Sequence, residues 1–233
     1  MVTSADLSVE RPRSLTATVA ERLRQAIIDA ELPLGSELSE VGLAAMLGVS
    51  RTPVREALTM LQIQGMVHIV PQKGSYVFFP TEEDLVELCE YRIVLESRAV
   101  GFALARRRDE ALAMLGTAQE AMASARESGD AVAYARADTR FHEAFIRNCR
   151  NRYLQDGYAL VAGRIATLRT HLSVPRPEIR ERSLAQHEEM LRAFAAGDVL
   201  TLESVLVGHI LATRQSYVRA LQEGLIDLPA RLP

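Results

Sequence analysis

The sequence predicts a mainly α-helical protein with two domains. Its 233 residues exceed the usual size of a single domain, so domains of about 75 and 150 residues are expected. Apolar residues recur at helical spacing through most of the chain, whereas residues 66–79 have the composition of a β-hairpin. We therefore expect three helices and a hairpin at the N-terminus, followed by an all-helical antiparallel bundle.

Breaks in this pattern divide the chain. Residues 1–13 are polar, contain Pro12 and show no periodicity, which indicates a flexible arm. The remaining divisions that we expect are an N-terminal domain at 14–79, a linker at 80–83, a helical domain at 84–222 and a C-terminal tail at 223–233.

The composition is that of a soluble globular protein, with 48% hydrophobic and 24% charged residues. No apolar run reaches the roughly 18 residues that cross a bilayer, and the N-terminus lacks the apolar core of a signal peptide, so a cytoplasmic protein with no membrane contact is expected. Cys89 and Cys149 are not in a CxxC pair and are interpreted as packing residues. The net charge of −3 does not by itself indicate a nucleic-acid binder.

Three helices are predicted in the N-terminal domain. The first starts at Leu15 and ends before Pro33, the second covers residues 38–46 and is closed by Gly48, and the third follows Ser50 and runs to Gly65. Residues 66–79 then form a hairpin with its turn at Lys73 and Gly74. Three helices and a hairpin make a winged helix-turn-helix.

The segment LAAMLGVSRTPVREAL, residues 43–58, has the form of a DNA-reading helix-turn-helix. Arg51 and Arg55 lie four residues apart on one helix face, where they suit guanine or phosphate contacts. We expect Ser50 to cap the helix, Thr52 to contact the DNA backbone, and the wing tip at Lys73 to reach a phosphate or the minor groove. The alternative is an ordinary helical hairpin with two solvated arginines.

Everything beyond residue 81 is predicted to be helical. The expected helices cover residues 82–108, 109–127, 130–148, 151–172, 178–196 and 198–222, with breaks at turn-forming residues.

Four metal-ligating side chains are predicted to point into the core of the helical domain. Asp138 and His142 are one helical turn apart, and His187 and His209 lie on the apolar faces of two other helices. Unpartnered polar groups are costly to bury, about 2–7 kcal/mol each in an apolar medium. A shared divalent ion, Zn²⁺, Ni²⁺ or similar, would satisfy all four. For each single histidine, a satisfied core residue is the alternative, and neither His68 nor His171 is placed in this set.

The N-terminal run resembles the GntR family of bacterial regulators, through LSE at 38–40 and LAAMLGVSRTPVREAL at 43–58. Ala30 and Leu34 depart from the glycine and proline usual in that family. This resemblance implies that Arg51 and Arg55 contact bases or phosphates, and that the wing tip at Lys73 and Gly74 reaches the minor groove.

The helical half resembles the FCD ligand-binding domain of FadR-type GntR regulators, whose members often carry the same D-x3-H, H, H pattern. The resemblance implies that Asp138, His142, His187 and His209 are metal ligands, and six helices favour the VanR-like branch. It also implies that Arg92 faces the pocket and binds an effector carboxylate, with a solvated surface arginine as the alternative. Arg164, on an inward-looking helix face, is a second effector-binding candidate.

These features predict a ligand-responsive transcriptional regulator, a repressor rather than an enzyme. It would bind a palindromic double-stranded DNA operator as a homodimer and sense a small carboxylic acid at the metal. Two other functions remain open. One is a metal-dependent hydrolase, although no HExxH motif or obvious general base accompanies the ligands. The other is a DNA-binding protein with a purely structural metal, which an open polar pocket beside the metal would argue against.

Overall fold

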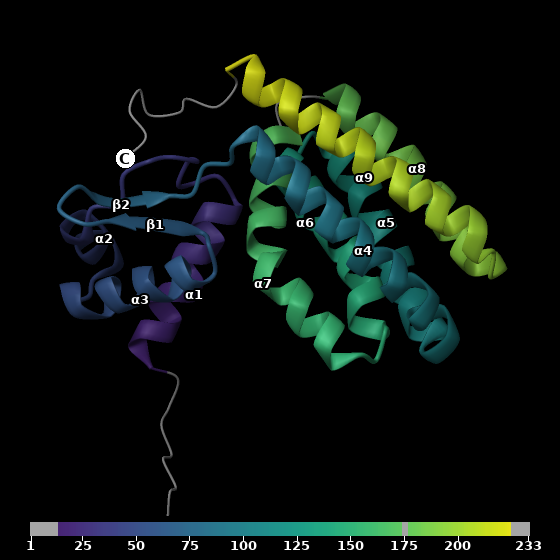
Figure 1. Ribbon diagram of the computed structural model, residues 1–233, viewed down its shortest axis with the longest axis horizontal. Coiled ribbons are helices and arrows are strands. Elements are labelled where there is room, and N and C mark those ends of the chain that lie inside the picture. Colours follow the sequence, from purple (N-terminus) through teal and green to yellow (C-terminus); the bar gives the residue numbers. More distant parts are fainter. Residues whose placement is uncertain (1–13, 174–176, 225–233) are drawn as a thin grey trace, which may run out of the picture.

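The computed structural model describes residues 14–173 and 177–224. These ranges contain nine α-helices, one two-stranded sheet and a π-helical turn. Figure 1 shows two parts side by side, α1 to α3 with the hairpin in one and α4 to α9 in the other. The expected mainly α-helical architecture is therefore confirmed. The expected arm at 1–13 and most of the expected C-terminal tail lie outside the described residues.

The N-terminal part is a winged helix-turn-helix. Its helices are α1 (Leu15–Ile28), α2 (Glu40–Leu47) and α3 (Arg51–Ile63), and its antiparallel hairpin joins β1 (Val67–Val70) to β2 (Gly74–Val77). Gly48 ends α2 at φ +65°, a left-handed conformation that glycine adopts without steric cost, and α3 begins three residues later. This tight turn fixes the angle between the two helices.

In the winged domain, the start of the second helix and the place of the wing turn differ from the prediction. The second helix begins at Glu40 rather than at residue 38, because the Leu38 N–H donates to Ser75 O of the wing and thereby extends the chain. The wing turn comprises residues 71–73, since Gly74 already pairs with Val70 as the first residue of β2.

The C-terminal part consists of long helices, which wrap a common core. They are α4 (Glu82–Arg106), α5 (Arg108–Ser128), α6 (Ala131–Asn148), α7 (Arg152–Leu168), α8 (Pro177–Ala196) and α9 (Val199–Gln222). A capping box between Thr81 and Asp84 starts α4, as its acidic first turn predicts. The helix expected at 151–172 departs from α-geometry near its end, where η1 (Arg169–Ser173) is π-helical.

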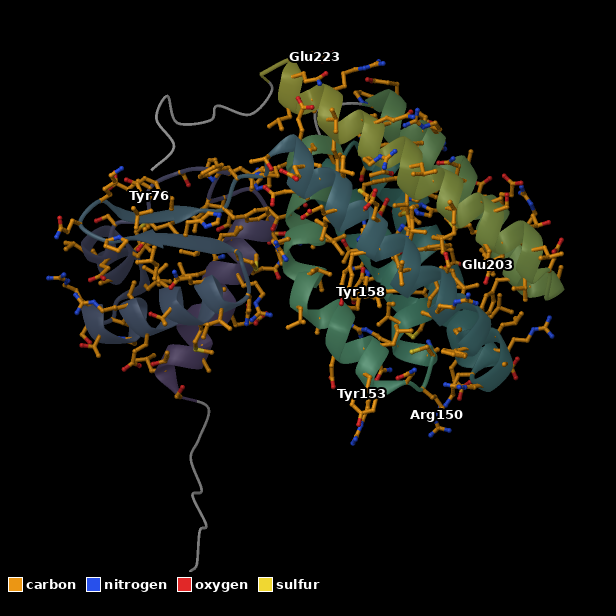
Figure 2. The ribbon with its side chains drawn as sticks, viewed as in Figure 1. Tyr76, Arg150, Tyr153, Tyr158, Glu203 and Glu223 are labelled. Atoms are coloured by element: carbon orange, nitrogen blue, oxygen red, sulfur yellow. The ribbon has the colours of Figure 1, made fainter. Side chains whose placement is uncertain are left out.

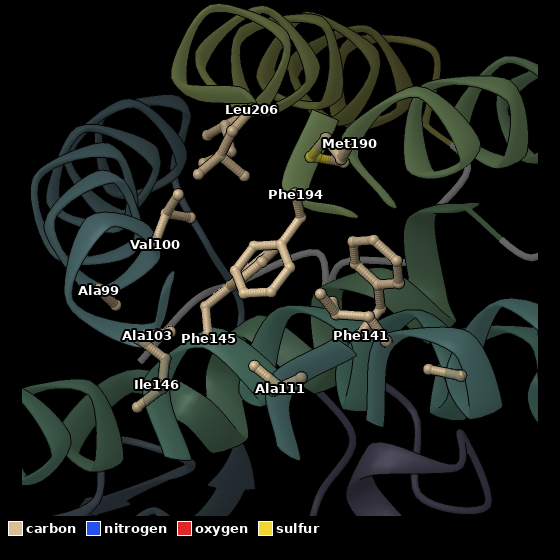
Figure 3. Close-up of a cluster of buried hydrophobic side chains, with 14 of the residues drawn as sticks. Ala99, Val100, Ala103, Ala111, Phe141, Phe145, Ile146, Met190, Phe194 and Leu206 are labelled. Atoms are coloured by element: carbon tan, nitrogen blue, oxygen red, sulfur yellow. The ribbon is translucent and has the colours of Figure 1, made fainter. Parts of the chain in front are cut away.

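Aromatic rings fill the centre of this core. Figure 3 shows Phe141 and Phe145 of α6 together with Phe194 of α8 and Val100 of α4. The ring centroid of Phe145 lies 5.7 Å from that of Phe141 and 5.8 Å from that of Phe194. Burying one such side chain contributes about 1.5–3 kcal/mol, so the rings that join α6 to α8 across the core contribute substantially to stability. They also fix the two helices that carry three of the four predicted ligands.

The two parts share a second hydrophobic cluster. Leu61 and Val77 of the winged domain are buried together with Leu168, Leu172 and Tyr217 of the helical domain. The joint between the domains is therefore packed rather than a loose tether. No helix in the described ranges is long and apolar enough to span a membrane.

Candidate metal centre and DNA-reading surface

The exposed end of α3 carries the predicted DNA-reading arginines. The side chains of Arg51 and Arg55 are 59% and 65% exposed, and both reach Glu40 on α2. Arg51 Nη2 lies 3.1 Å from Glu40 Oε2, and Arg55 donates to both Glu40 oxygens at 3.0 and 2.9 Å. A hydrogen bond from Arg55 is the largest cause of a lowered Glu40 pKa, about 2. Glu40 is thus a carboxylate that holds two guanidinium groups beside each other.

The other predicted DNA contacts surround these arginines on the exposed surface. Ser50 occupies the N-cap position of α3, but its hydroxyl makes no capping hydrogen bond, contrary to expectation. Thr52 is exposed in the first turn. Lys73 is exposed in the wing turn, and Gly74 follows it at φ +130°. Figure 2 shows Tyr76 on the same hairpin, where its hydroxyl donates to Lys73 O at 3.0 Å. This bond braces the wing tip from within the hairpin.

Three of the predicted metal ligands converge in the helical domain. His142 on α6, His187 on α8 and His209 on α9 are fully or almost fully buried, and one ring nitrogen from each lies within 4.8 Å of the others. His142 Nε2 is 3.2 Å from His187 Nε2. Tetrahedral Zn²⁺ with bonds near 2.0–2.1 Å requires donor atoms about 3.3 Å apart. His142 and His187 therefore have nearly the spacing that a metal ion imposes, and the ligand atom of His209 lies within 4.8 Å of theirs.

The fourth predicted ligand, Asp138, lies beside this triad. Its Oδ1 is 3.7 Å from His142 Nε2, and its Oδ2 is 3.9 Å from His187 Nε2. Ser183 donates to Oδ2 at 3.3 Å, and Arg169 Nε lies 2.6 Å from Oδ1. The carboxylate thus faces the same centre as the imidazoles while it contacts a cation from η1.

Oxygen acceptors orient two of the imidazole rings. His142 Nδ1 lies 2.6 Å from Glu96 Oε2, and His209 Nδ1 lies 3.0 Å from Gln186 Oε1. A carboxylate and an amide oxygen can only accept, so each Nδ1 carries the proton and each Nε2 keeps a lone pair. Metal-binding histidines are commonly oriented in this way, by a second hydrogen bond on the far side of the ring.

The electrostatics keep the donors in the protonation state that binds metal. Burial is the largest influence on the three histidines, and it lowers the pKa of His187 to about 4 and those of His142 and His209 well below the ordinary value. Burial raises the pKa of Asp138, but neighbouring positive charge, that of Arg169 foremost, outweighs burial and holds that pKa below its usual range. Neutral imidazoles and an ionised carboxylate are the ligand forms that a divalent cation requires.

Two buried arginines adjoin the cluster. Arg92, which is 1% exposed, donates through Nε to Glu96 Oε1 at 2.8 Å, so the alternative of a solvated surface arginine is wrong. Arg92 Nη2 and Arg169 Nη2 are both buried without a hydrogen-bond partner among the described residues. The Tyr158 hydroxyl is likewise unpartnered, and burial raises its pKa to about 12. The site therefore holds unused hydrogen-bond donors, which suit an anion.

The structure does not bring Arg164 to this cluster. A side-chain atom at Gly65 would lie 3.3 Å from the Arg164 guanidinium, which places Arg164 against the winged domain. His171 is also separate, as expected, and contacts Ile27 O at 3.0 Å. The His68 ring lies 5.6 Å from the Phe79 ring, tilted by 49°, away from the cluster. A cavity of about 20 Å³ adjoins the histidine cluster and is lined by polar groups that include Asp138, Arg169 and Ser183. It has room for about one water molecule.

Sequence reasoning missed three partners of the predicted ligands, namely Glu96, Arg169 and Gln186. Glu96 follows Arg92 by four residues on α4, and that spacing was the available signal. Arg169 and Gln186 carry no local signal, because each acts through a contact across 23 or more residues of sequence.

The winged helix-turn-helix with exposed arginines, joined to a helical domain with a histidine cluster, defines a DNA-binding transcriptional regulator. Residues 15–77 match the family described as bacterial regulatory proteins, gntR family, and residues 87–212 match the FCD domain. The chain belongs to the GntR family and has the FadR-type architecture with a C-terminal FCD domain.

Relatives and solved structures agree with this assignment. A probable D-xylose utilization operon transcriptional repressor of Paenarthrobacter nicotinovorans is 31% identical over 204 residues, which cover 86% of this chain and 89% of that protein. An uncharacterized HTH-type transcriptional regulator of Agrobacterium vitis is 39% identical over 127 residues, 53% of this chain and 74% of that protein. The crystal structure of a putative GntR regulator from Rhodococcus sp. RHA1 superposes with a TM-score of 0.79 at 26% identity, covering 88% of this chain and 98% of that one. These are transcriptional regulators, and the chain is a regulator rather than an enzyme.

Proposed function

We propose that the protein is a cytoplasmic, metal-dependent repressor that binds a palindromic operator as a homodimer and responds to a small organic acid. The observation that carries the sensing half is the orientation of His142 and His209. Each has its Nδ1 held by an oxygen, at Glu96 and Gln186, while the Nε2 atom is left for a metal. Asp138 and His187 supply the remaining donors.

Charge balance favours an anionic effector at this metal. The buried carboxylates Asp138 and Glu96 are matched by the buried guanidinium groups of Arg169 and Arg92. A divalent cation adds two positive charges to a buried site that is already neutral, and uncompensated buried charge is costly. A carboxylate would compensate one of these two charges and accept hydrogen bonds from the unpartnered Nη2 atoms of the two arginines.

The DNA-reading half rests on α3 and the wing. The proposed DNA contacts lie at the start of α3 and on the wing. They are Ser50 at the N-cap of α3, Arg51, Thr52 and Arg55 within that helix, and Lys73 and Gly74 on the wing. Residues 1–80 contain seven Lys or Arg and eight Asp or Glu, so affinity cannot come from a strongly basic domain. Two copies, each presenting this local patch to one half-site, would supply it. The relative from Paenarthrobacter nicotinovorans, named as a probable repressor, supports the same sign of regulation.

A purely structural metal is the second candidate. The adjoining cavity of about 20 Å³ favours it, because an organic acid does not fit without rearrangement. An acid effector therefore requires the wall that contains Arg169 to move.

A thermal-shift screen separates the two candidates. Zinc-loaded protein is heated with small mono-, di- and tricarboxylic acids and with sugar acids, with and without chelator. An acid effector raises the melting temperature only when the metal is present. Its binding increases the free energy of unfolding by RT ln(1 + [L]/Kd). The His187→Ala variant, which lacks one ligand, serves as the control and should lose the response. A flat screen with metal bound would support the structural role.

A further inference from the structure

The C-terminal end of α1 is held by the helical domain through two polar contacts. His171 Nε2 lies 3.0 Å from Ile27 O, one of the last carbonyls of α1, which also accepts from the Ala30 N–H at 3.3 Å. Arg136 Nε lies 2.8 Å from Asp29 Oδ1, and its Nη2 lies 2.7 Å from Oδ2, in a two-point contact. The Asp29 side chain is only 5% exposed, so Arg136 is its main source of compensation at a negative helix end.

The two residues of the helical domain that contact the end of α1 are each close in sequence to a residue of the proposed metal centre. Arg136 precedes Asp138 by two residues on α6, and His171 follows Arg169 by two residues on η1. Asp138 and Arg169 are in turn joined to each other at 2.6 Å. The ion pair inside the sensing site and the two contacts on α1 therefore share the same pair of elements.

The local geometry of η1 suits it to transmit a displacement. Single π-helical turns are uncommon and often occur at functional sites, because their wider hydrogen bonding is easily rearranged. Leu168 and Leu172 flank Arg169 and are buried in the cluster that also contains Ile27 and Leu61 of the winged domain. A shift of η1 must therefore carry these side chains along or disturb that shared core.

From α1 the displacement can reach the DNA-reading helix. α1 and α3 pack along each other in the core of the winged domain, and Thr16 donates to Glu56 on α3 at 2.6 Å. A cleft of about 510 Å³, lined by residues of α1, α6 and α7, leaves space for α1 to change its angle to the helical domain. Figure 1 shows α1 on the side of the winged domain that faces α7.

We propose that the ion pair between Arg169 and Asp138 is the switch that couples the sensing site to the DNA-reading domain. A metal that binds Asp138 competes with Arg169 for Oδ1. Release of Arg169 moves η1, and the contacts of His171 and Arg136 carry the movement to the end of α1. The inference rests on the proposed metal centre and adds the route by which its occupation is sensed.

Hydrogen exchange on the full chain, stripped of metal and then given Zn²⁺ alone, tests this route. In wild type, Zn²⁺ should change the exchange of amides at the C-terminal end of α1 by about fivefold, the effect of one hydrogen bond on a local opening equilibrium. His171→Leu should still bind one Zn²⁺ per chain by calorimetry but show a clearly smaller change, because only the Arg136 contact remains. His171→Gln, whose amide can still donate to Ile27 O, should restore the full change. Asp29→Asn should weaken the response through the second contact, and circular dichroism checks that each variant is folded.

The outcomes separate the route from the metal site. A full response at α1 in folded His171→Leu would overturn the route, as would a response absent from wild type that binds Zn²⁺. If wild type binds no Zn²⁺, the proposed metal centre fails instead. The route is then measured with Asp138→Asn, which weakens the hold on Arg169 without metal. That variant should alter exchange at the end of α1, and an unaltered pattern would overturn the route.

Discussion

His142 Nδ1 lies 2.6 Å from Oε2 of Glu96, and both side chains are fully buried. Glu96 simultaneously accepts from Arg92 at 2.8 Å through its other oxygen. The carboxylate therefore orients the imidazole with one oxygen and holds a guanidinium beside the site with the other. Its position makes it the main determinant of how His142 faces the proposed metal.

Glu96→Gln should weaken metal binding by about 10- to 100-fold, the usual effect of removing the partner of a metal-binding histidine. The amide is neutral and can present its N–H to His142, which disturbs the ring orientation. Competition with a zinc-binding dye measures the affinity. Glu110→Gln, in the exposed pair with Arg107, is the control and should have no effect. An unchanged affinity in Glu96→Gln would show that His142 does not ligate the metal through Nε2.

Arg51→Ala combined with Arg55→Ala should abolish specific operator binding and leave the fold intact, because both side chains are exposed. An operator selected from random DNA by the wild-type protein provides the ligand, and a footprint at several salt concentrations provides the readout. If the arginines contact phosphates, the loss of each one also reduces, by about one, the slope of the logarithm of affinity against the logarithm of salt concentration. Arg22→Ala, an exposed arginine of α1 that pairs with Glu31 beyond the end of that helix, is the matched control. Footprints that survive the double substitution would remove α3 as the DNA-reading helix.

Glu40→Gln should raise affinity for non-specific DNA at low salt and reduce discrimination in favour of the operator. At neutral pH, Glu40 carries a full negative charge, since its pKa of about 2 lies far below. That charge repels phosphates but also holds Arg51 and Arg55 in one place. Fluorescence anisotropy with operator and scrambled DNA gives both affinities. Equal affinities for wild type and variant on both DNAs would contradict a role for this contact.

Ala30→Gly should stabilise the protein by about 1 kcal/mol, the approximate cost of a left-handed conformation for a residue with a Cβ atom. Ala30 has φ +64°, in the turn where the family usually has glycine. The free energy of unfolding by urea measures the change. Ala113→Gly, at an exposed position inside α5, provides a control of opposite sign, with a loss of about 0.5–1 kcal/mol. A loss of stability in Ala30→Gly would show that this turn is not strained.

The sequence predicted the helices well because most are long and several end at a clear stop such as Gly48 or Gly129. It predicted less well the places where distant segments compete with local preference. Leu38 is extended because it pairs with Ser75 of the wing, which no local pattern indicates. The π-helical turn at Arg169 is likewise absent from the spacing of apolar residues.

The site divides in the same way. His142, His187 and His209 could be predicted because each lies on the apolar face of its helix, and in the structure the three rings come together. Arg92 and Arg164 could not be distinguished, since both lie on partly apolar faces. Only the packing of α4 and α7 places one beside Glu96 and the other against Gly65. Partners such as Arg169 depend on tertiary contacts and had no counterpart in the sequence pattern.

Metal content most directly tests the central claim that the helical domain is a metal-dependent sensor. Protein purified without chelators or an affinity tag that binds metal is subjected to elemental analysis, together with folded His187→Ala and His171→Leu variants. The proposed ligand set predicts about one divalent ion per chain in the wild type and in His171→Leu, and none in His187→Ala. Wild type without metal that also fails to take up added Zn²⁺, or His187→Ala with the full wild-type content, would contradict the claim.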